Sequence, residues 1–192
     1  MNETNNIGKA IKDAFGFLEP IFSDTAKLLE IVEDAMKRAK LVSLWGAVSA
    51  WDRSWAYYGH YGWIAHYLNR LYVPQPSSGQ KPDLSDKIVL FVCVYFRPES
   101  LTQPIVMSGL VKYHDTSQQF WVFWHDTMAK NAGPAFLNQE KTEEWVVYSE
   151  DGLPGFEKMC YQICPLVELS SKDAVEKLCA EALAKFSSER IE

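Results

Sequence analysis

The sequence lacks the short motifs by which many nucleotide-binding and hydrolytic sites are recognised. It contains no G-x-x-x-x-G-K-[ST], G-x-G-x-x-G or G-x-S-x-G pattern and no EF-hand loop. Neither C-x-x-C nor a paired Cys/His knuckle occurs among its four cysteines. We therefore assign no catalytic residue, expect no metal or cofactor, and leave open whether the chain is an enzyme.

Long apolar segments are also missing. The longest uninterrupted run, Ile88 to Phe96, has nine residues, whereas a membrane-spanning helix needs about 20. The polar N-terminus has no apolar core of a secretory signal. We therefore expect a cytoplasmic protein with no membrane partner, in which the cysteines are reduced and Cys93 is buried and inert.

The chain has fewer basic residues than acidic ones. The chain has 19 Lys and Arg against 25 Asp and Glu, giving a net charge of −6. Its one basic cluster, Lys37 to Lys40, lies within about two helical turns of Glu30, Glu33 and Asp34, which is typical of a solvated helix face. Because binding to a nucleic acid duplex usually requires a basic patch, we expect no nucleic acid partner.

Aromatic residues, by contrast, are abundant and concentrated. They make up 14% of the chain, and the segment from Trp45 to Tyr72 holds four of the seven Trp and five of the nine Tyr. Such a segment can form a core, line a pocket or present a partner-binding face. The sequence alone does not choose among these three.

The length favours one domain over residues 1–192. Residues 1–73 are expected to be helical, and residues 84–192 to be β-rich with a C-terminal helix. The Pro- and Ser-rich segment between them reads as a loop inside the domain. The strands need a helical layer to cover them, so neither part is expected to stand alone.

Three helices are predicted in the first part. The first has a buried face and ends at Pro20, because helices rarely continue through the residue before a proline. The second starts near Ser23 and runs to about Tyr58, and the third covers Trp63 to Tyr72. The predicted buried face of the first consists of Ile7, Ala10, Ile11, Ala14, Phe15 and Leu18. The stripe of the second consists of Leu28, Val32, Ala35, Ala39, Val42, Gly46 and Ser49.

The second part predicts an antiparallel sheet of four to five strands, and the class is therefore α+β. In the segment from Lys87 to Phe96, apolar residues occupy both sets of alternating positions. A strand that is buried on both faces has this pattern, so the segment indicates a central strand. A last helix is capped by Ser170 or Ser171. The other predicted strands are Ile105 to Tyr113, Gln119 to His125, Glu144 to Tyr148, and Met159 to Leu169 as one strand or two.

The candidate site residues come from the helical phase of the aromatic segment. On a helix Arg53, Tyr57 and His60 share one face, and a core stripe of Trp51, Trp55 and Tyr58 occupies another. If the first face looks into a cavity, Arg53 could anchor an anionic ligand, Tyr57 could donate a hydrogen bond and His60 could act as acid or base. The alternative is a solvated helix face.

His125 is a further candidate, because it follows a predicted strand and could be lifted to the rim of the sheet. The favoured hypothesis is a binding or interaction domain without catalysis, whose partner is a protein or a small molecule. Homo-oligomerisation is an open option. The alternative hypothesis is a small enzyme or ligand-binding regulator with an anionic-ligand pocket lined by Arg53, Tyr57 and His60.

Overall fold

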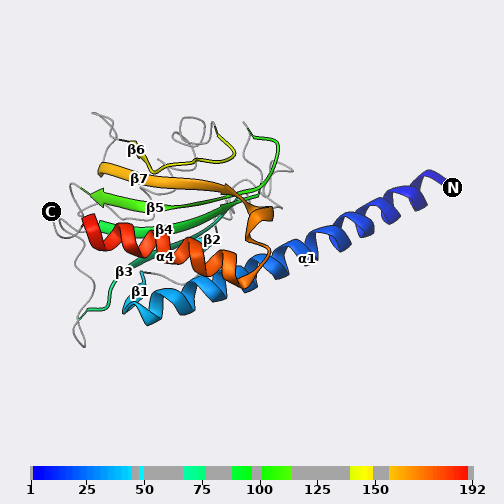
Figure 1. Cartoon of the computed structure of the whole chain (residues 1–192). Coiled ribbons are helices and arrows are strands. Elements are labelled where there is room, and N and C mark those ends of the chain that lie inside the picture. Colours follow the sequence, from blue (N-terminus) through cyan, green and yellow to red (C-terminus); the bar gives the residue numbers. More distant parts are fainter. Residues whose placement is uncertain are drawn as a thin grey trace.

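The computed structural model describes residues 2–44, 48–49, 67–76, 88–96, 101–113, 139–148 and 156–189. The fold is α+β, as predicted: an antiparallel sheet is combined with an N-terminal and a C-terminal helix (Figure 1). The elements in chain order are α1 (Asn2–Arg38), β1 (Leu41–Ser43), β2 (Val48–Ser49), β3 (Tyr67–Pro74), β4 (Ile88–Tyr95), β5 (Ile105–Tyr113), β6 (Val146–Tyr148), β7 (Phe156–Pro165), the 3-10 turn η3 (Leu166–Leu169) and α4 (Lys172–Glu189).

The sheet runs in the order β1-β3-β4-β5-β7-β6, and β2 adds a short second pairing to β3. Every pairing is antiparallel. The described residues thus contain seven strands, more than the four to five predicted. The central position of β4 is confirmed, because it lies between β3 and β5 and is buried on both faces.

Each face of the sheet belongs to its own hydrophobic cluster. Leu90, Val92 and Val94 of β4 face the helices, while Val89, Phe91 and Cys93 face the other way. Alternation along a strand separates these two sets. Both clusters are well buried.

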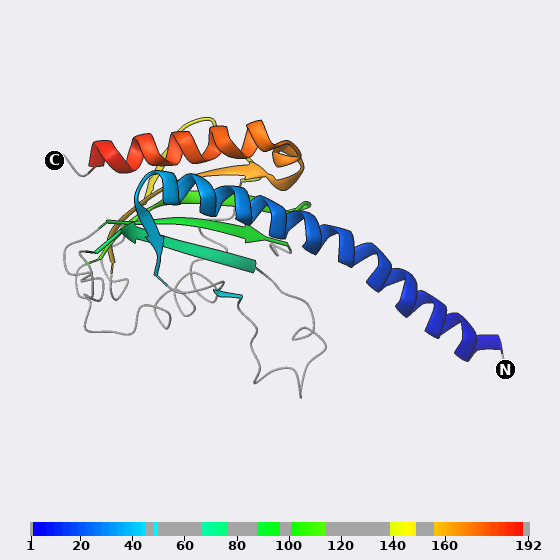
Figure 2. The same ribbon diagram turned by 90° about the horizontal axis from the view of Figure 1, so that it is seen from below.

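The two helices cover the same face of the sheet. Figure 2 shows α4 and the C-terminal half of α1 running along one side of the strands. Leu28 and Val32 of α1 and Leu178 and Ala182 of α4 are buried in a single cluster. Arg38 also forms an ion pair with Glu176 of α4, with 3.3 Å between nitrogen and oxygen.

The prediction that Pro20 ends a helix is wrong, because α1 runs through it as one helix of 37 residues. Pro20 has no N–H and removes one backbone hydrogen bond. Just beyond it the helix is packed, because the ring of Phe22 meets that of Phe96 edge-on at 5.2 Å. Within the helix, the Thr25 hydroxyl donates to the Ile21 carbonyl at 2.8 Å.

The second predicted helix is confirmed only from Ser23 to Arg38, and the third is wrong in its described part. The helical stripe stops at Arg38, and Lys40 turns the chain in the left-handed region with φ 59°. Val42 then belongs to β1, which pairs with the end of β3. Tyr67 to Tyr72, predicted as helix, lies in β3 and pairs with β4 along its length. The expected helical part, 1–73, therefore contains three strands.

The C-terminal part follows the sequence more closely. The Ser171 hydroxyl accepts a hydrogen bond from the amide of Ala174 at 3.2 Å and caps α4, as predicted. The predicted strand from Met159 to Leu169 is one strand, β7, up to Pro165, where the chain turns into η3. The strand predicted at 119–125 lies outside the described residues.

Candidate functional site

The site residues expected from the sequence all fall outside the part of the chain that the structure describes. This holds for Arg53, Tyr57, His60 and His125. It holds equally for the proposed core stripe of Trp51, Trp55 and Tyr58. The pocket expected there stays a prediction.

The most unusual described surface is the N-terminal half of α1. Residues 2–20, here called the arm, project beyond the end of the sheet (Figures 1 and 2). The side chains of Ile7, Phe15 and Phe17 are 60%, 65% and 71% exposed. The prediction that this face is buried is therefore wrong within the chain, because the sheet does not extend beneath it.

The exposed face of the arm continues a stripe that is buried farther along the same helix. Beyond the arm, Thr25, Leu28, Val32 and Ala35 are buried under the sheet and α4. The full stripe alternates steps of four and three residues and consists of Ile7, Ile11, Ala14, Leu18, Ile21, Thr25, Leu28, Val32 and Ala35. The same spacing of apolar residues therefore occurs in the packed half of α1 and in the solvent-exposed arm.

The polar face of the arm carries both signs of charge. Lys9, Lys12, Asp13 and Glu19 are all exposed. A helix that lies on an anionic bilayer is usually rich in Lys and Arg on its polar face, and this one is balanced. In the described part of the chain, no helix has the length and apolar character to cross a membrane. The charges described on this face are therefore not of the predominantly basic kind that such membrane-surface helices carry.

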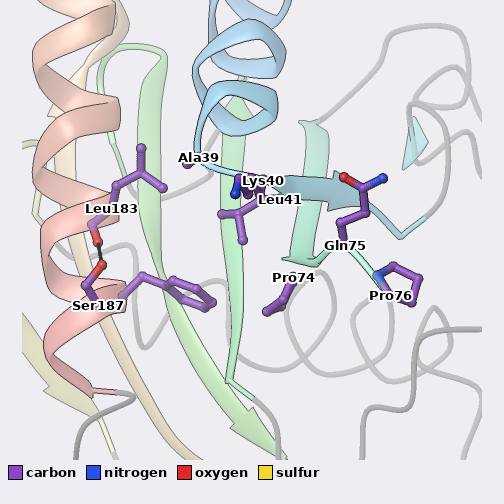
Figure 3. A pocket seen from close by; sticks show the side chains of 9 residues that line it. Ala39, Lys40, Leu41, Pro74, Gln75, Pro76, Leu183 and Ser187 are labelled. Atoms are coloured by element: carbon purple, nitrogen blue, oxygen red, sulfur yellow. Dashed lines mark hydrogen bonds between the residues drawn. The ribbon is translucent and has the colours of Figure 1, made fainter. Parts of the chain in front are cut away.

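A cavity of about 750 Å³ lies where α1, β1, β3 and the end of α4 meet. Figure 3 shows Leu41, Pro74 and Leu183 around it, with Lys40 at its edge. The Ser187 hydroxyl is already engaged, because it donates to the Leu183 carbonyl at 2.9 Å. Among the described residues that line it, Lys40 alone is charged, so these residues offer an apolar surface and one cation but no acid–base pair.

A smaller cavity of about 360 Å³ lies between α1 and β3. Its α1 wall carries Glu30, Glu33 and Asp34, and β3 contributes Arg70, whose Nε is buried without a hydrogen-bond partner. The described lining residues include one more charged side chain, that of Lys37, so carboxylates outnumber cations among them by three to two. The cavity therefore suits a ligand that presents a cationic group together with an anionic one.

On the opposite face of the sheet, the side chain of Asn69 is buried among apolar neighbours. It is 1% exposed, and neither its Oδ1 nor its Nδ2 has a hydrogen-bond partner. Its cross-strand neighbour is Cys93, which is hydrogen bonded to Tyr95. Burial raises the pKa of both the Cys93 thiol and the Tyr95 phenol, so neither group ionises near neutral pH.

The remaining cysteines are poorly suited to nucleophilic chemistry. All four are free. Burial raises the pKa of Cys164 and of Cys179 to about 11, whereas a reactive thiol needs a lowered pKa. Among the described residues, no group of three or more His, Cys, Asp or Glu side chains is placed to hold a metal ion.

Sequence reasoning missed the arm as a surface and Arg70 and Asn69 as unsatisfied groups. The signal for the last two was present, since Asn69 and Arg70 interrupt the apolar run of Tyr67 to Val73. The arm offered no comparable signal, because its periodicity is that of any half-buried helix.

Known proteins give no indication of what this surface binds. No protein-family model, curated protein or solved structure matches the chain.

Proposed function

We propose that this chain is a protein-binding domain that engages its partner through the arm. The observation that carries the proposal is the exposure of Ile7, Phe15 and Phe17 on a helix that projects from the fold. Exposed apolar residues that occur singly are ordinary, but a large exposed apolar surface marks an interaction site. Phe15 and Phe17 lie about 160° apart around the helix, so the two rings flank the apolar stripe on its two sides. The proposal requires no catalytic group.

The arm is also poorly stabilised as a helix. Most helical stability in proteins comes from the packing of an apolar face rather than from intrinsic propensity. The arm has no packed face for most of its length, and it contains Gly8, Gly16 and Pro20, which all disfavour helix. A partner that covers the apolar face would supply the missing stabilisation.

Site-specific photocrosslinking tests the proposal. A benzoylphenylalanine at position 17 should give a defined protein adduct in the cells that make this chain, because Phe17 is on the apolar face. The same group at position 12, on the polar face, is the matched control and should give much less. Equal labelling at both positions, or adducts with lipid alone, would refute the proposal.

Small-ligand binding is a second candidate, favoured by the buried and unpartnered Nε of Arg70 at the acidic cavity. A zwitterionic metabolite at about 100 times its dissociation constant should add about 2.7 kcal/mol to the free energy of unfolding. The Arg70→Gln variant should lose that gain. The same screen tests the alternative pocket of Arg53, Tyr57 and His60, through the variant Arg53→Gln.

A further inference from the structure

We propose that the larger cavity binds a small apolar carboxylate, such as a medium-chain fatty acid or an aryl carboxylic acid. The carboxylate would lie at Lys40, and the apolar body would lie against Leu41 and Leu183. This site goes beyond the proposed function, because it lies at the C-terminal ends of α1 and α4, whereas the arm is the N-terminal half of α1. The two can therefore be tested separately.

The first argument is that the Lys40 ammonium group has no ionic partner among the described residues. Beyond the arm, the other described Lys and Arg side chains, apart from Arg70, all form an ion pair with a carboxylate. Arg70 lines the smaller cavity, so the two unpaired cations both lie at cavities. The paired ones are Lys27, Lys37, Arg38, Lys112, Lys141, Lys158, Lys172, Lys177 and Lys185.

The second argument is the backbone at Lys40. Its φ of 59° is a left-handed conformation that glycine usually adopts after a helix end, and that other residues adopt at a steric cost. Its amide donates to the Lys37 carbonyl at 2.9 Å, and its carbonyl accepts from the Gln75 amide at 3.0 Å. The base of the side chain is thereby fixed at the edge of the cavity (Figure 3).

The helix dipole does not explain a lysine at this position. Lys37 and Arg38 already place two positive charges in the last turn of α1. A lysine that is held where glycine fits better therefore indicates a use for its ammonium group.

The third argument is the apolar lining of the cavity. Leu41 and Phe186 are buried, and Leu183 and Pro74 are half-buried beside them. The volume of about 750 Å³ lies within the range of roughly 300–1,000 Å³ that small-molecule sites occupy. None of the described lining residues is acidic. Apolar walls with one cation at the edge are complementary to an apolar molecule that carries one negative charge.

The charges around the cavity favour a carboxylate over a phosphate. Ala39 and Lys40 follow the end of α1, and Ser187 lies two residues before the end of α4. Both helix ends carry partial negative charge. A phosphate monoester carries about −1.5 to −2 at pH 7, which one lysine cannot balance beside these ends. A carboxylate carries a single charge, which Lys40 matches.

Isothermal titration calorimetry of the full chain with octanoate and with octanol tests the proposal, because the two probes have similar apolar chains and differ in charge. We expect octanoate to bind about tenfold more tightly than octanol, since its carboxylate gains a charge-assisted bond at a partly open site. Lys40→Met should remove that preference and keep the binding of octanol, because methionine retains a flexible apolar side chain. Lys37→Met is the matched control. It removes the same charge from the last turn of α1, outside the lining of this cavity, and should keep the preference.

Methyl NMR locates the bound probe. The resonances of Leu41 and Leu183 should shift on addition of octanoate. Those of Leu29 and Leu68, which line the smaller cavity, should not. Circular dichroism checks that the variants keep the fold. Because the preference is a ratio of two affinities measured on one protein, a partial loss of folded protein does not imitate the loss of the Lys40 contact.

Each outcome decides the proposal. A preference for octanoate that Lys40→Met removes and Lys37→Met keeps, with shifts at Leu41 and Leu183, supports it. Failure of octanoate to bind, equal affinity for the two probes, or a preference that survives Lys40→Met overturns it. Shifts at Leu29 and Leu68 instead would place the carboxylate in the smaller cavity and would also overturn it. The photocrosslinking of the arm tests the proposed function independently of these results.

Discussion

The hydroxyl of Tyr72 donates a hydrogen bond to Oε2 of Glu33 at 3.1 Å and so ties β3 to α1. Tyr72 is fully buried. Burial, together with the negative charge of Glu33, raises the pKa of the phenol well above its usual range. The bond lies near the C-terminal end of α1, so it anchors the buried half of the helix to the sheet.

Removing this hydroxyl should weaken the attachment of α1. We expect Tyr72→Phe to lower the free energy of unfolding by about 1–2 kcal/mol, because bonds to charged groups contribute about 1.5–3 kcal/mol and the Glu33 side chain is 25% exposed. Glu33→Gln keeps an acceptor and should cost less. Urea titration measures both. A Tyr72→Phe midpoint equal to that of the parent chain would mean that the bond contributes nothing in solution.

Asn69 should be replaceable with a gain in stability. Its buried amide has no partner, and an unsatisfied buried polar group costs about 1–3 kcal/mol. We expect Asn69→Val to raise the free energy of unfolding by about 1 kcal/mol, since valine also suits a strand.

Ser108 is the matched control, because it is equally buried but accepts a hydrogen bond from Gln162 at 3.3 Å. Ser108→Ala should lower stability by about 1 kcal/mol. If Asn69→Val were the destabilising variant, the amide would have to be hydrogen bonded in the folded protein.

Gly109 is required by a close approach of two strands. A Cβ there would meet the carbonyl oxygen of Cys160, which is backbone and cannot turn aside, and the ring of Phe91 at 2.7 Å. Overpacking of this kind costs about 1–3 kcal/mol or more, so Gly109→Ala should shift the thermal midpoint strongly downward. Gly16→Ala in the arm has nothing within 4 Å and should instead raise helicity. A tolerated Gly109→Ala would contradict this register of β5 and β7.

Thiol alkylation should depend on pH in a way that reflects burial. The pKa of Cys164 and of Cys179 is raised from 9.0 to about 11, and the thiolate is the reactive form. The native rate should therefore rise about tenfold per pH unit without levelling off up to pH ~9.5. A plateau near pH 9 would show thiols with ordinary pKa values.

The same shifts set the direction of the stability change with pH. The folded protein holds these protons more tightly than the unfolded chain. The contribution is therefore complete below about pH 9 and is lost as the pH rises through about 11.

Local patterns in the sequence predict the C-terminal part of the fold better than the N-terminal part. The run from Ile88 to Tyr95 identifies a strand buried on both faces, and the spacing of Val175, Leu178, Ala182 and Phe186 identifies α4. By contrast, Ala39 and Val42 continue a helical stripe that the chain does not follow. Instead, Leu41 pairs with Pro74 in the sheet. Local spacing does not encode this long-range pairing.

The arm shows a second limit to what the sequence can predict. The spacing of Ile7, Ala14 and Leu18 says that one face of a helix needs cover. It does not say whether that cover comes from the same chain. Only the position of the helix relative to the sheet distinguishes the arm from the buried half, in which Leu28 and Val32 hold equivalent places in the stripe.

Hydrogen exchange along α1 tests the central claim most directly. In dilute protein, amides of residues 7–20 should exchange orders of magnitude faster than those of residues 28–36, because only the latter lie under the sheet and α4. Binding of a partner protein should protect the arm, while residues 28–36 stay unchanged. An arm that is strongly protected at the lowest concentration would be packed within its own chain, and this result would contradict the account.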